Sequence, residues 1–319
     1  MGRFWMGLMA MLMTGCNSIE FSVLVDNASE GGFWSAWGPS PDDVWVVGGQ
    51  ADAGVVMRGN ADGFSSLGVP EGTPLLNWVH GSSASDIWVG GLSGALLHWD
   101  GSSWSDHSVD MDEAFWGLYV VSPSEAYAVG GLSGWGGDTR VAMRYDGTTW
   151  TDISLPAELD ESKALFKVHH DGTDIWMVGA QGAALVGDGD QFEPVATGVT
   201  ADLSTIHSRG DGRVFAVGGQ ATGVIVSGTR AEGLSEVAQA PARLFGVHAL
   251  GSGDVIVSGF QGYLGRLSAE EALVPIPTPT SQILHAVFGH DGKRLYAVGG
   301  NIGSISDDFT GVILTSKAP

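Results

Sequence analysis

Short apolar runs that end in small residues recur along the chain at nearly constant intervals. They lie at 43–49, 86–91, 125–131, 174–180, 213–219, 254–259 and 294–300. Aligning their small residues at 48, 90, 130, 179, 218, 258 and 299 gives spacings of 42, 40, 49, 39, 40 and 41 residues. A period of about 40–50 residues with several short strands per unit is typical of β-propeller blades. The 287 residues from Phe33 to Pro319 make seven units of 41, so we expect seven blades.

Each unit reads as four antiparallel strands joined by tight turns. A first strand precedes the apolar run, at 75–81, 165–170, 203–208, 244–249 and 284–289. The run itself is the second strand, and its apolar residues on both faces indicate cover from two sides, here by neighbouring blades. Third strands follow at 55–58, 95–99, 141–145, 224–227 and 312–316. Asp-Gly pairs at 62–63, 100–101, 146–147 and 188–189 are suited to the hairpin turns that follow. Fourth strands start at Phe64, Trp104, Trp150, Phe192, Leu234 and Leu273.

The last unit has three strands before the chain ends, and its fourth lies at the other end of the sequence. Residues 19–25 read as a strand, with Phe21 in the position of the fourth-strand anchors. We therefore expect 19–25 to pair with 312–316 in the last blade and to close the ring, which protects the sheet edges. The alternative is a disordered tether, which the alternating apolar pattern disfavours.

Composition narrows the function classes. The chain has 36 acidic and 14 basic residues, a net charge of −22, 50 glycines and one cysteine. Such a charge argues against binding nucleic-acid backbones, which attract Lys and Arg. A single cysteine excludes a disulfide framework and a cysteine-based zinc site. The glycines leave few stretches that could form long helices.

The N-terminus reads as an export signal. Arg3 precedes an apolar run from Phe4 to Met13, which is too short for a permanent membrane span but suits a signal peptide. The sequence Met13-Thr14-Gly15-Cys16 resembles the lipobox of bacterial lipoproteins, although Met13 stands where leucine is usual. The resemblance implies a signal peptide over 1–15 and fatty acylation of Cys16, for example by palmitate. The alternative is a hydrophobic N-terminus with an incidental cysteine.

This reading sets the expected domains and location. Residues 16–18 would be a lipid-anchored tether and 19–319 a single propeller domain, with blades from residue 33. The mature chain would carry 13 basic and 36 acidic residues, so anionic headgroups repel it and the lipid alone would hold it to the membrane. Asn17 is not the aspartate that favours inner-membrane retention, which points to the outer membrane, on its periplasmic face or at the cell surface.

The repeats resemble two known groups of propellers. The apolar run, Gly-Gly pair, Tyr-Asp and Trp of 126–150 are similar to Kelch repeats, and the units also resemble Asp-Gly-x-x-Trp repeats of bacterial secreted lipoproteins. The fifth and sixth units lack the Asp-Gly and Trp elements. The resemblance implies a rigid disc that binds partners through its loops.

One column of the aligned first strands holds a ring in every unit, namely Trp37, His80, Tyr119, His169, His207, His248 and Phe288. First strands lie nearest the central channel, so these rings could form a floor that binds an anion or a sugar. Repetition in every unit favours the alternative, packing beneath the neighbouring blade. A metal site is not expected, because side chains from separate blades would be too far apart to converge on one ion.

Other candidate contact residues lie on loops. Trp135 is on the long loop 131–140, either exposed as a contact residue or folded over its own blade, and 300–311 is the other long loop. Acidic clusters at 110–113, 188–190 and 307–308 match no calcium loop and read as solvated turns.

Catalysis finds little support in the sequence. Arg58, Arg144 and Arg266 end third strands away from the channel, so they cannot form a sialidase-like cluster. Nucleophile-elbow, metalloprotease and phosphate-loop motifs are absent, and we expect no cofactor. The favoured hypothesis is an exported, lipid-anchored scaffold that presents loops to a protein or glycan, without enzymatic activity. Two alternatives stay open, an outer-membrane assembly factor and a glycan-processing enzyme.

Overall fold

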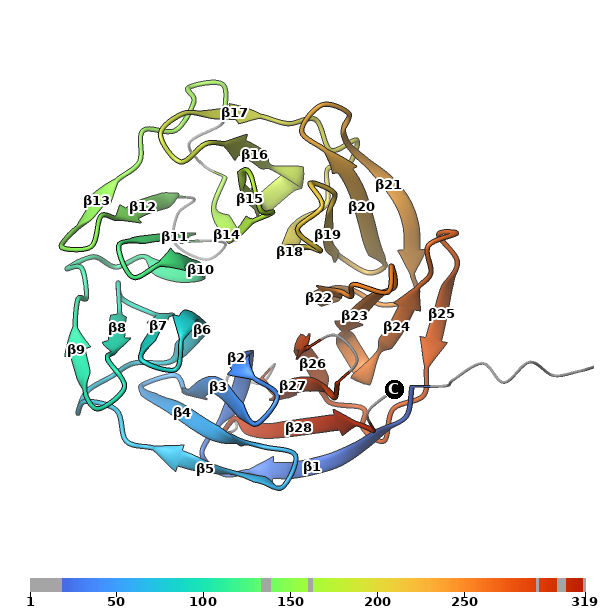
Figure 1. Ribbon diagram of the computed structural model, residues 1–319. Coiled ribbons are helices and arrows are strands. Elements are labelled where there is room, and N and C mark those ends of the chain that lie inside the picture. The colour runs from blue at the N-terminus through green and yellow to red at the C-terminus, as the bar shows by residue number, and fades with distance from the viewer. Residues whose placement is uncertain (1–18, 133–138, 160–162, 291–292, 303–307, 318–319) are drawn as a thin grey trace, which may run out of the picture.

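The computed structural model describes residues 19–132, 139–159, 163–290, 293–302 and 308–317. In these residues 28 strands form seven antiparallel sheets of four strands each. The sheets are arranged as blades around a central axis, with the first strand of each blade innermost (Figure 1). First strands of successive blades contact one another, and β26 contacts β2, so the ring is closed. The predicted seven-bladed propeller is confirmed.

The first three blades follow one another from residue 32. Blade 1 contains β2 (Gly32–Ser40), β3 (Asp43–Gln50), β4 (Ala53–Asn60) and β5 (Gly63–Leu67). Blade 2 contains β6 (Leu76–Ser83), β7 (Asp86–Gly91), β8 (Leu96–Trp99) and β9 (Trp104–Asp106). Blade 3 contains β10 (Ala114–Ser122), β11 (Glu125–Gly131), β12 (Val141–Tyr145) and β13 (Trp150–Asp152).

The next three blades include the two short 3-10 turns of the described chain. Blade 4 contains β14 (Leu165–His170), β15 (Ile175–Gly179), η1 (Ala180–Gly182), β16 (Ala184–Gly187) and β17 (Phe192–Pro194). Blade 5 contains β18 (Leu203–Ser208), β19 (Val214–Gly219), β20 (Gly223–Thr229) and β21 (Gly233–Ala240). Blade 6 contains β22 (Leu244–Ala249), β23 (Val255–Gly259), η2 (Phe260–Gly262), β24 (Leu264–Leu267) and β25 (Leu273–Ile276).

Blade 7 joins the two ends of the chain. It contains β26 (Ile283–Gly289), β27 (Leu295–Asn301), β28 (Thr310–Ser316) and, as its outer strand, β1 (Phe21–Ala28). β1 lies along β28 with Phe21 opposite Ser316 (Figure 1). In blade 2, Trp104 takes the same place opposite Trp99, so Phe21 is a fourth-strand anchor as predicted. The strand begins two residues later than predicted and continues to Ala28.

The hydrophobic core lies between neighbouring blades. All residues of β7, β15, β19 and β23 are buried, because each second strand is covered on both sides. Most of the apolar clusters join residues of two adjacent blades, as where Tyr127 of blade 3 packs with Leu165 and Met177 of blade 4. Burial between blades explains why these strands are apolar on both faces.

A glycine column brings the second strand close to the first. The residues opposite the buried starts of the first strands are Gly48, Gly91, Gly130, Gly179, Gly218, Gly259 and Gly299. A Cβ at any of them would overlap the carbonyl oxygen of the residue just before that buried start. The sequence alignment was wrong by one residue in blades 2 and 6, where Gly90 and Ser258 were placed in this column. Counting from the turn residues Asp86 and Asp254 gives the correct register.

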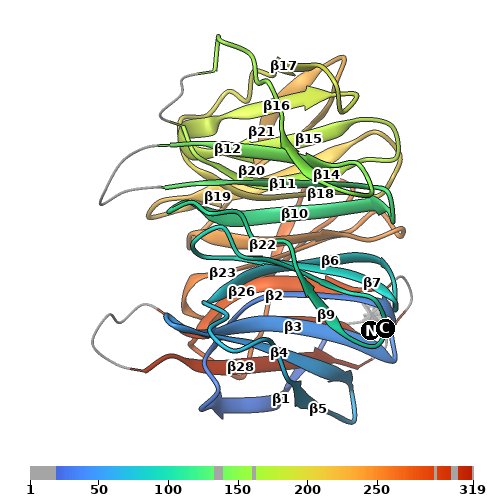
Figure 2. The same ribbon diagram turned by 90° about the vertical axis from the view of Figure 1, so that its left-hand side faces the viewer.

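Two faces of the disc follow from the topology. We call the face with the starts of the first strands and the second-to-third connections the mouth face, and the opposite face, with the first-to-second and third-to-fourth turns, the turn face. Figure 2 shows the disc from its side, with the strands crossing between these faces. Glu20 and Lys317 form an ion pair beside the Phe21–Ser316 pair, so both described ends of the chain lie at the turn face.

The Asp-Gly turns on the turn face have the predicted conformation. Gly63, Gly101, Gly147 and Gly189 all have positive φ. The Asp100 carboxylate accepts a hydrogen bond from the Ser102 hydroxyl and backbone N–H bonds from Ser102 and Ser103. The hydroxyl bond has the largest effect, and together these bonds lower the pKa of Asp100 to about 2. No helix in the described ranges is both long enough and apolar enough to cross a bilayer.

Candidate binding site at the central channel

The predicted column of rings comes together at the centre of the disc. Each member faces the same second-strand position, as His80 faces Trp88 and His169 faces Trp176. Successive ring centroids are 5.3, 4.1, 5.1, 4.8, 4.5 and 5.8 Å apart, in the order Trp37, His80, Tyr119, His169, His207, His248 and Phe288. We call these seven residues the ring column.

Three histidines of the ring column also link their blade to the next one. His80 Nδ1 accepts a hydrogen bond from the Val120 N–H at 3.0 Å, and His207 Nδ1 accepts one from the Ala249 N–H at 3.2 Å. His169 Nε2 accepts one from the Ser208 N–H at 3.0 Å. In each case the donor follows the ring-column residue of the next blade. These three members of the ring column are therefore each bonded to the neighbouring blade.

These bonds and their burial keep the imidazoles neutral. Desolvation is the main cause that lowers the pKa of His80 to about 3, and the nearby His169 is a smaller one. Desolvation, followed by His170 and His248, lowers the pKa of His169 to about 3. Burial also places the pKa of His207 well below its ordinary value. A nitrogen that accepts an N–H bond cannot carry a proton, so geometry and burial favour the same state.

Side chains of the ring column lie closer together than the sequence analysis expected. Rings on separate blades are not far apart, since the centroids of His169 and His207 lie 4.8 Å from each other. In the described segments, however, no three His, Cys, Asp or Glu side chains are placed to hold a metal ion. At least one nitrogen of His80, His169 and His207 is already bonded to the next blade.

A central cavity of about 250 Å³ lies against the ring column. The whole ring column lines it, together with the residues two positions earlier in three blades, Trp78, Thr205 and Ala286. The cavity therefore extends from the ring column toward the mouth face. It is large enough for a small apolar group and too small for a folded element.

A second column at the channel was missed by the sequence analysis. Every first strand has a one-residue bulge at the same place, between its buried start and the residue two positions later. The bulged residues are Trp34, Asn77, Trp116, Phe166, Ser204, Phe245 and His285. We call them the bulge column. β-bulges re-aim side chains and are over-represented beside functional sites.

The bulge column lines the mouth face with aromatic rings. The His285 ring lies 4.5 Å from the Trp34 ring and 5.3 Å from the Phe245 ring, so rings of blades 7, 1 and 6 join. His285 Nδ1 donates to the Trp34 carbonyl at 2.8 Å, and Trp116 Nε1 donates to the Gly131 carbonyl at 2.9 Å. Burial, followed by Lys167, lowers the pKa of His285 to about 3. Each bulged residue directly follows the buried start of its strand, but the sequence gives no sign of the bulge itself, so the sequence analysis missed the column.

Several predicted sites lie wholly or partly outside the described residues. Cys16 and Trp135 lie outside them, as does 303–307 of the loop 300–311. The described end of that loop is tied down, because the Gln50 side chain exchanges two 2.8 Å hydrogen bonds with the backbone of Phe309. Asp308 and Asp110 are exposed to solvent.

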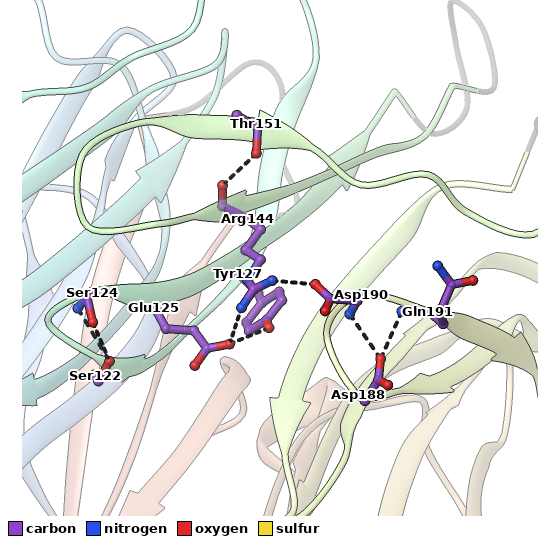
Figure 3. Close-up of polar contacts among 9 residues, drawn as sticks. All are labelled: Ser122, Ser124, Glu125, Tyr127, Arg144, Thr151, Asp188, Asp190 and Gln191. Carbon is purple, nitrogen blue, oxygen red and sulfur yellow. Dashed lines mark hydrogen bonds and ion pairs between the residues drawn. The ribbon is translucent and has the colours of Figure 1, made fainter.

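The acidic cluster at 188–190 is part of a link between blades 3 and 4 (Figure 3). Asp188 accepts N–H bonds from Asp190 and Gln191 within its turn. Arg144 reaches Asp190 at 2.6 Å and Glu125 at 3.0 Å, and Glu125 accepts a 2.7 Å bond from the Tyr127 hydroxyl. The Asp190 carboxylate therefore has a structural role, because it joins blade 4 to Arg144 of blade 3.

The three arginines at third-strand ends do not converge. Arg58 pairs with Asp43 at 2.6 Å and Arg266 with Asp254 at 3.8 Å, each within its own blade, and Arg144 pairs within blade 3 and with blade 4. The prediction that they form no common cluster is confirmed.

Comparison with known proteins places the fold and leaves the family open. No protein-family model and no curated protein matches the sequence. A structure of YCF48 bound to a D1 peptide is 13% identical, with a TM-score of 0.69 over 96% of this chain and 98% of that one. The WD40 propeller domain of Doa1 is 13% identical, with a TM-score of 0.68 over 92% and 97%. The RRP9 WD40 repeats are 12% identical, with a TM-score of 0.70 over 93% and 98%. At these identities the likeness concerns the β-propeller fold.

Proposed function

We propose that the protein is a non-enzymatic scaffold that binds a partner protein at its mouth face. The observation that carries this proposal is the bulge column, which repeats in all seven blades and places rings of Trp34, Phe245 and His285 together at one end of the channel. Aromatic side chains in preformed positions are typical of binding hot spots. A closed ring holds them in place before binding, which reduces the entropy lost on association.

Further support comes from an exposed ring beside the channel. Phe260 of η2 follows β23 on the mouth face and is 45% exposed, one of three large apolar residues so exposed in the described chain. The other two, Val23 and Val274, lie on the outer strands β1 and β25. The similar structure of YCF48 holds a peptide, which favours a protein over a glycan as the class of partner.

Site-specific photo-crosslinking tests this proposal. A benzophenone amino acid replaces Phe260 in one variant and Val23 in a control, and both are irradiated in cells that make the protein. We expect a partner adduct from position 260 that is absent at position 23, and that diminishes when Trp34→Ala and Phe245→Ala are added. Adducts from position 23 with none from 260 would refute a mouth-face partner.

We also propose that the protein is exported and held to the membrane by lipid on Cys16 alone, not by its surface. Cys16 precedes Ile19 by three residues, and Glu20 lies at the turn face. The mouth face would then point away from the bilayer. The acidic character of the chain supports a lipid anchor over electrostatic attachment.

Intact-mass measurement of the detergent-extracted protein should give a mass above that of the chain 16–319 by its acyl groups, and Cys16→Ser should release the protein from membranes. An unmodified Cys16 would contradict the anchor.

Two finer assignments belong to this proposal. Kinship with Asp-Gly-x-x-Trp lipoprotein repeats is supported by the turn-anchored Trp104 and Trp150, which open the outer strands of blades 2 and 3. We propose an outer-membrane location because Asn17, and not an aspartate, follows Cys16. Fractionation of inner and outer membranes tests the location, and recovery with the inner membrane would contradict it.

A further inference from the structure

Lys167 is a buried cation in the channel. It lies on β14, two positions before His169, and is 5% exposed. Its Nζ donates to the Trp116 carbonyl at 2.6 Å and lies 3.5 Å from the centre of the Trp78 ring. An ammonium group has three donors, and the second contact is a cation–π interaction, so the charge is incompletely compensated.

The fold does not require a lysine at this position. The residues at the same register in the other blades are Ser35, Trp78, Gly117, Thr205, Gly246 and Ala286. Most are small, and none is charged. Six blades therefore form without a cation here, and a buried unpaired charge usually destabilises a protein. A destabilising residue that the fold can do without points to a binding role.

The chain makes room for the Lys167 side chain to reach past blade 3 to blade 2. Blade 3 lies between blades 2 and 4, and there the equivalent residue is Gly117. A Cβ on Gly117 would lie 2.7 Å from Lys167 Cα and 3.1 Å from Lys167 Cδ. Lys167 and Trp78 meet across this glycine, and we call the pair the crossbar. Trp78 also lines the 250 Å³ cavity, so the crossbar lies at the end of the cavity nearer the mouth face.

The charge around the crossbar is positive within an acidic protein. Lys167 and Arg243 both lower the pKa of His285, which places their charges near the aromatic mouth. Arg243 forms an ion pair with Asp202 at 3.7 Å. Lys167 has no such partner: burial alone lowers its pKa, and no carboxylate among the described residues acts on it. An anion in contact with Lys167 would favour its ammonium form.

We propose that the crossbar is a receptor for a carboxylate attached to an apolar or aromatic body. The carboxylate pairs with Lys167, and the body lies against Trp78 and the rings of the channel. This inference rests on the proposed function, since the chain end of a partner protein would carry such a group. A free aromatic acid has the same chemistry.

Calorimetric titration of the whole protein tests the proposal. The probes are N-acetyl-phenylalanine, its amide, benzoate, and a pentapeptide with a glycine-serine spacer that ends in a free phenylalanine carboxylate. The variants are Lys167→Met, which keeps the apolar stem, and Lys293→Met, which removes an exposed lysine from the turn face. We expect N-acetyl-phenylalanine to bind about tenfold more tightly than its amide. Lys167→Met should abolish that preference, and Lys293→Met should preserve it.

Thermal unfolding shows whether the Lys167→Met variant is folded, so that a loss of binding is not mistaken for misfolding. Because Lys167→Met removes a buried charge, the variant should be at least as stable as the wild type while it loses binding. Tighter binding of the pentapeptide than of benzoate identifies a chain end as the source, and the reverse identifies a free acid. Equal affinity for acid and amide, or unchanged binding in a folded Lys167→Met variant, would overturn the inference. If position 260 still cross-links a partner in that case, the proposed function stands and the carboxylate receptor alone fails.

Discussion

His169 in blade 4 accepts a 3.0 Å hydrogen bond at Nε2 from the backbone N–H of Ser208 in blade 5. His80 and His207 make equivalent bonds to Val120 and Ala249 of the blades that follow them. Each bond requires an unprotonated nitrogen, so these three contacts between blades depend on neutral imidazole.

Stability should therefore fall as the solution becomes acidic. The pKa of His169 is about 3 in the folded protein, below its ordinary value of 6.5, so the unfolded chain binds more protons between these limits. The free energy of unfolding is then highest above pH 6.5 and decreases by about 1.4 kcal/mol per pH unit for each such histidine. Urea unfolding at pH 7.5, 6.0 and 5.0 measures the slope. His169→Gln should reduce it by about one histidine's share, and an unchanged slope would refute the assignment.

Because β1 closes the ring, substitutions at its buried and exposed positions should differ in their effect on the free energy of unfolding. Phe21 is partly buried and packs against the cluster that contains Ile256 and Leu314, whereas Val23 is 42% exposed. We expect Phe21→Ala to lower the free energy of unfolding by about 1–3 kcal/mol and Val23→Ala by less than about 0.5 kcal/mol. Chemical denaturation measures both. Equal and negligible effects would mean that β1 does not hold blade 7 in solution.

The glycine column predicts a contrast between adjacent residues of blade 2. A Cβ on Gly91 would overlap the Leu75 carbonyl oxygen, whereas on Gly90 it would meet the Phe115 Cβ at 3.2 Å. Gly91→Ala should cost about 3 kcal/mol or more, and Gly90→Ala about 1 kcal/mol. Thermal or urea unfolding measures the difference, and the opposite order would restore the alignment of Gly90 with Gly48.

The blade 3 network predicts which of its carboxylates matters. Glu125 is the acceptor for the buried Tyr127 ring's hydroxyl and also pairs with Arg144, while the Asp190 side chain is 78% exposed. Glu125→Ala should cost about 1–3 kcal/mol because it removes a partly buried acceptor. Asp190→Ala should cost less than about 1 kcal/mol, since exposed ion pairs contribute little. A larger loss from Asp190→Ala in denaturation measurements would contradict this ranking.

The sequence was sufficient to predict the fold because each blade repeats the same packing problem. The blade count, the ring column and the role of Phe21 all follow from a pattern that is independently present several times. Alignment from the ends of the apolar runs misplaced Gly90 and Ser258, because both stand where blade 1 has Val47.

The channel chemistry was harder to predict. A bulge inserts one residue into the two-residue period of a strand, so Trp34 and His285 read as ordinary strand positions. Lys167 has no counterpart in the other blades, so the repeat pattern hides it. Its burial depends on Trp78 and Gly117, which come from two other blades and meet it only in the folded ring.

Hydrogen exchange of the complex with the partner cross-linked at position 260 tests whether the aromatic end of the channel is the binding face. We expect slower exchange at the starts of the first strands, in 32–36, 114–118 and 244–247, and unchanged exchange at the turns 41–42, 84–85 and 123–124. Protection of those turns, or of the outer strands alone, would contradict it.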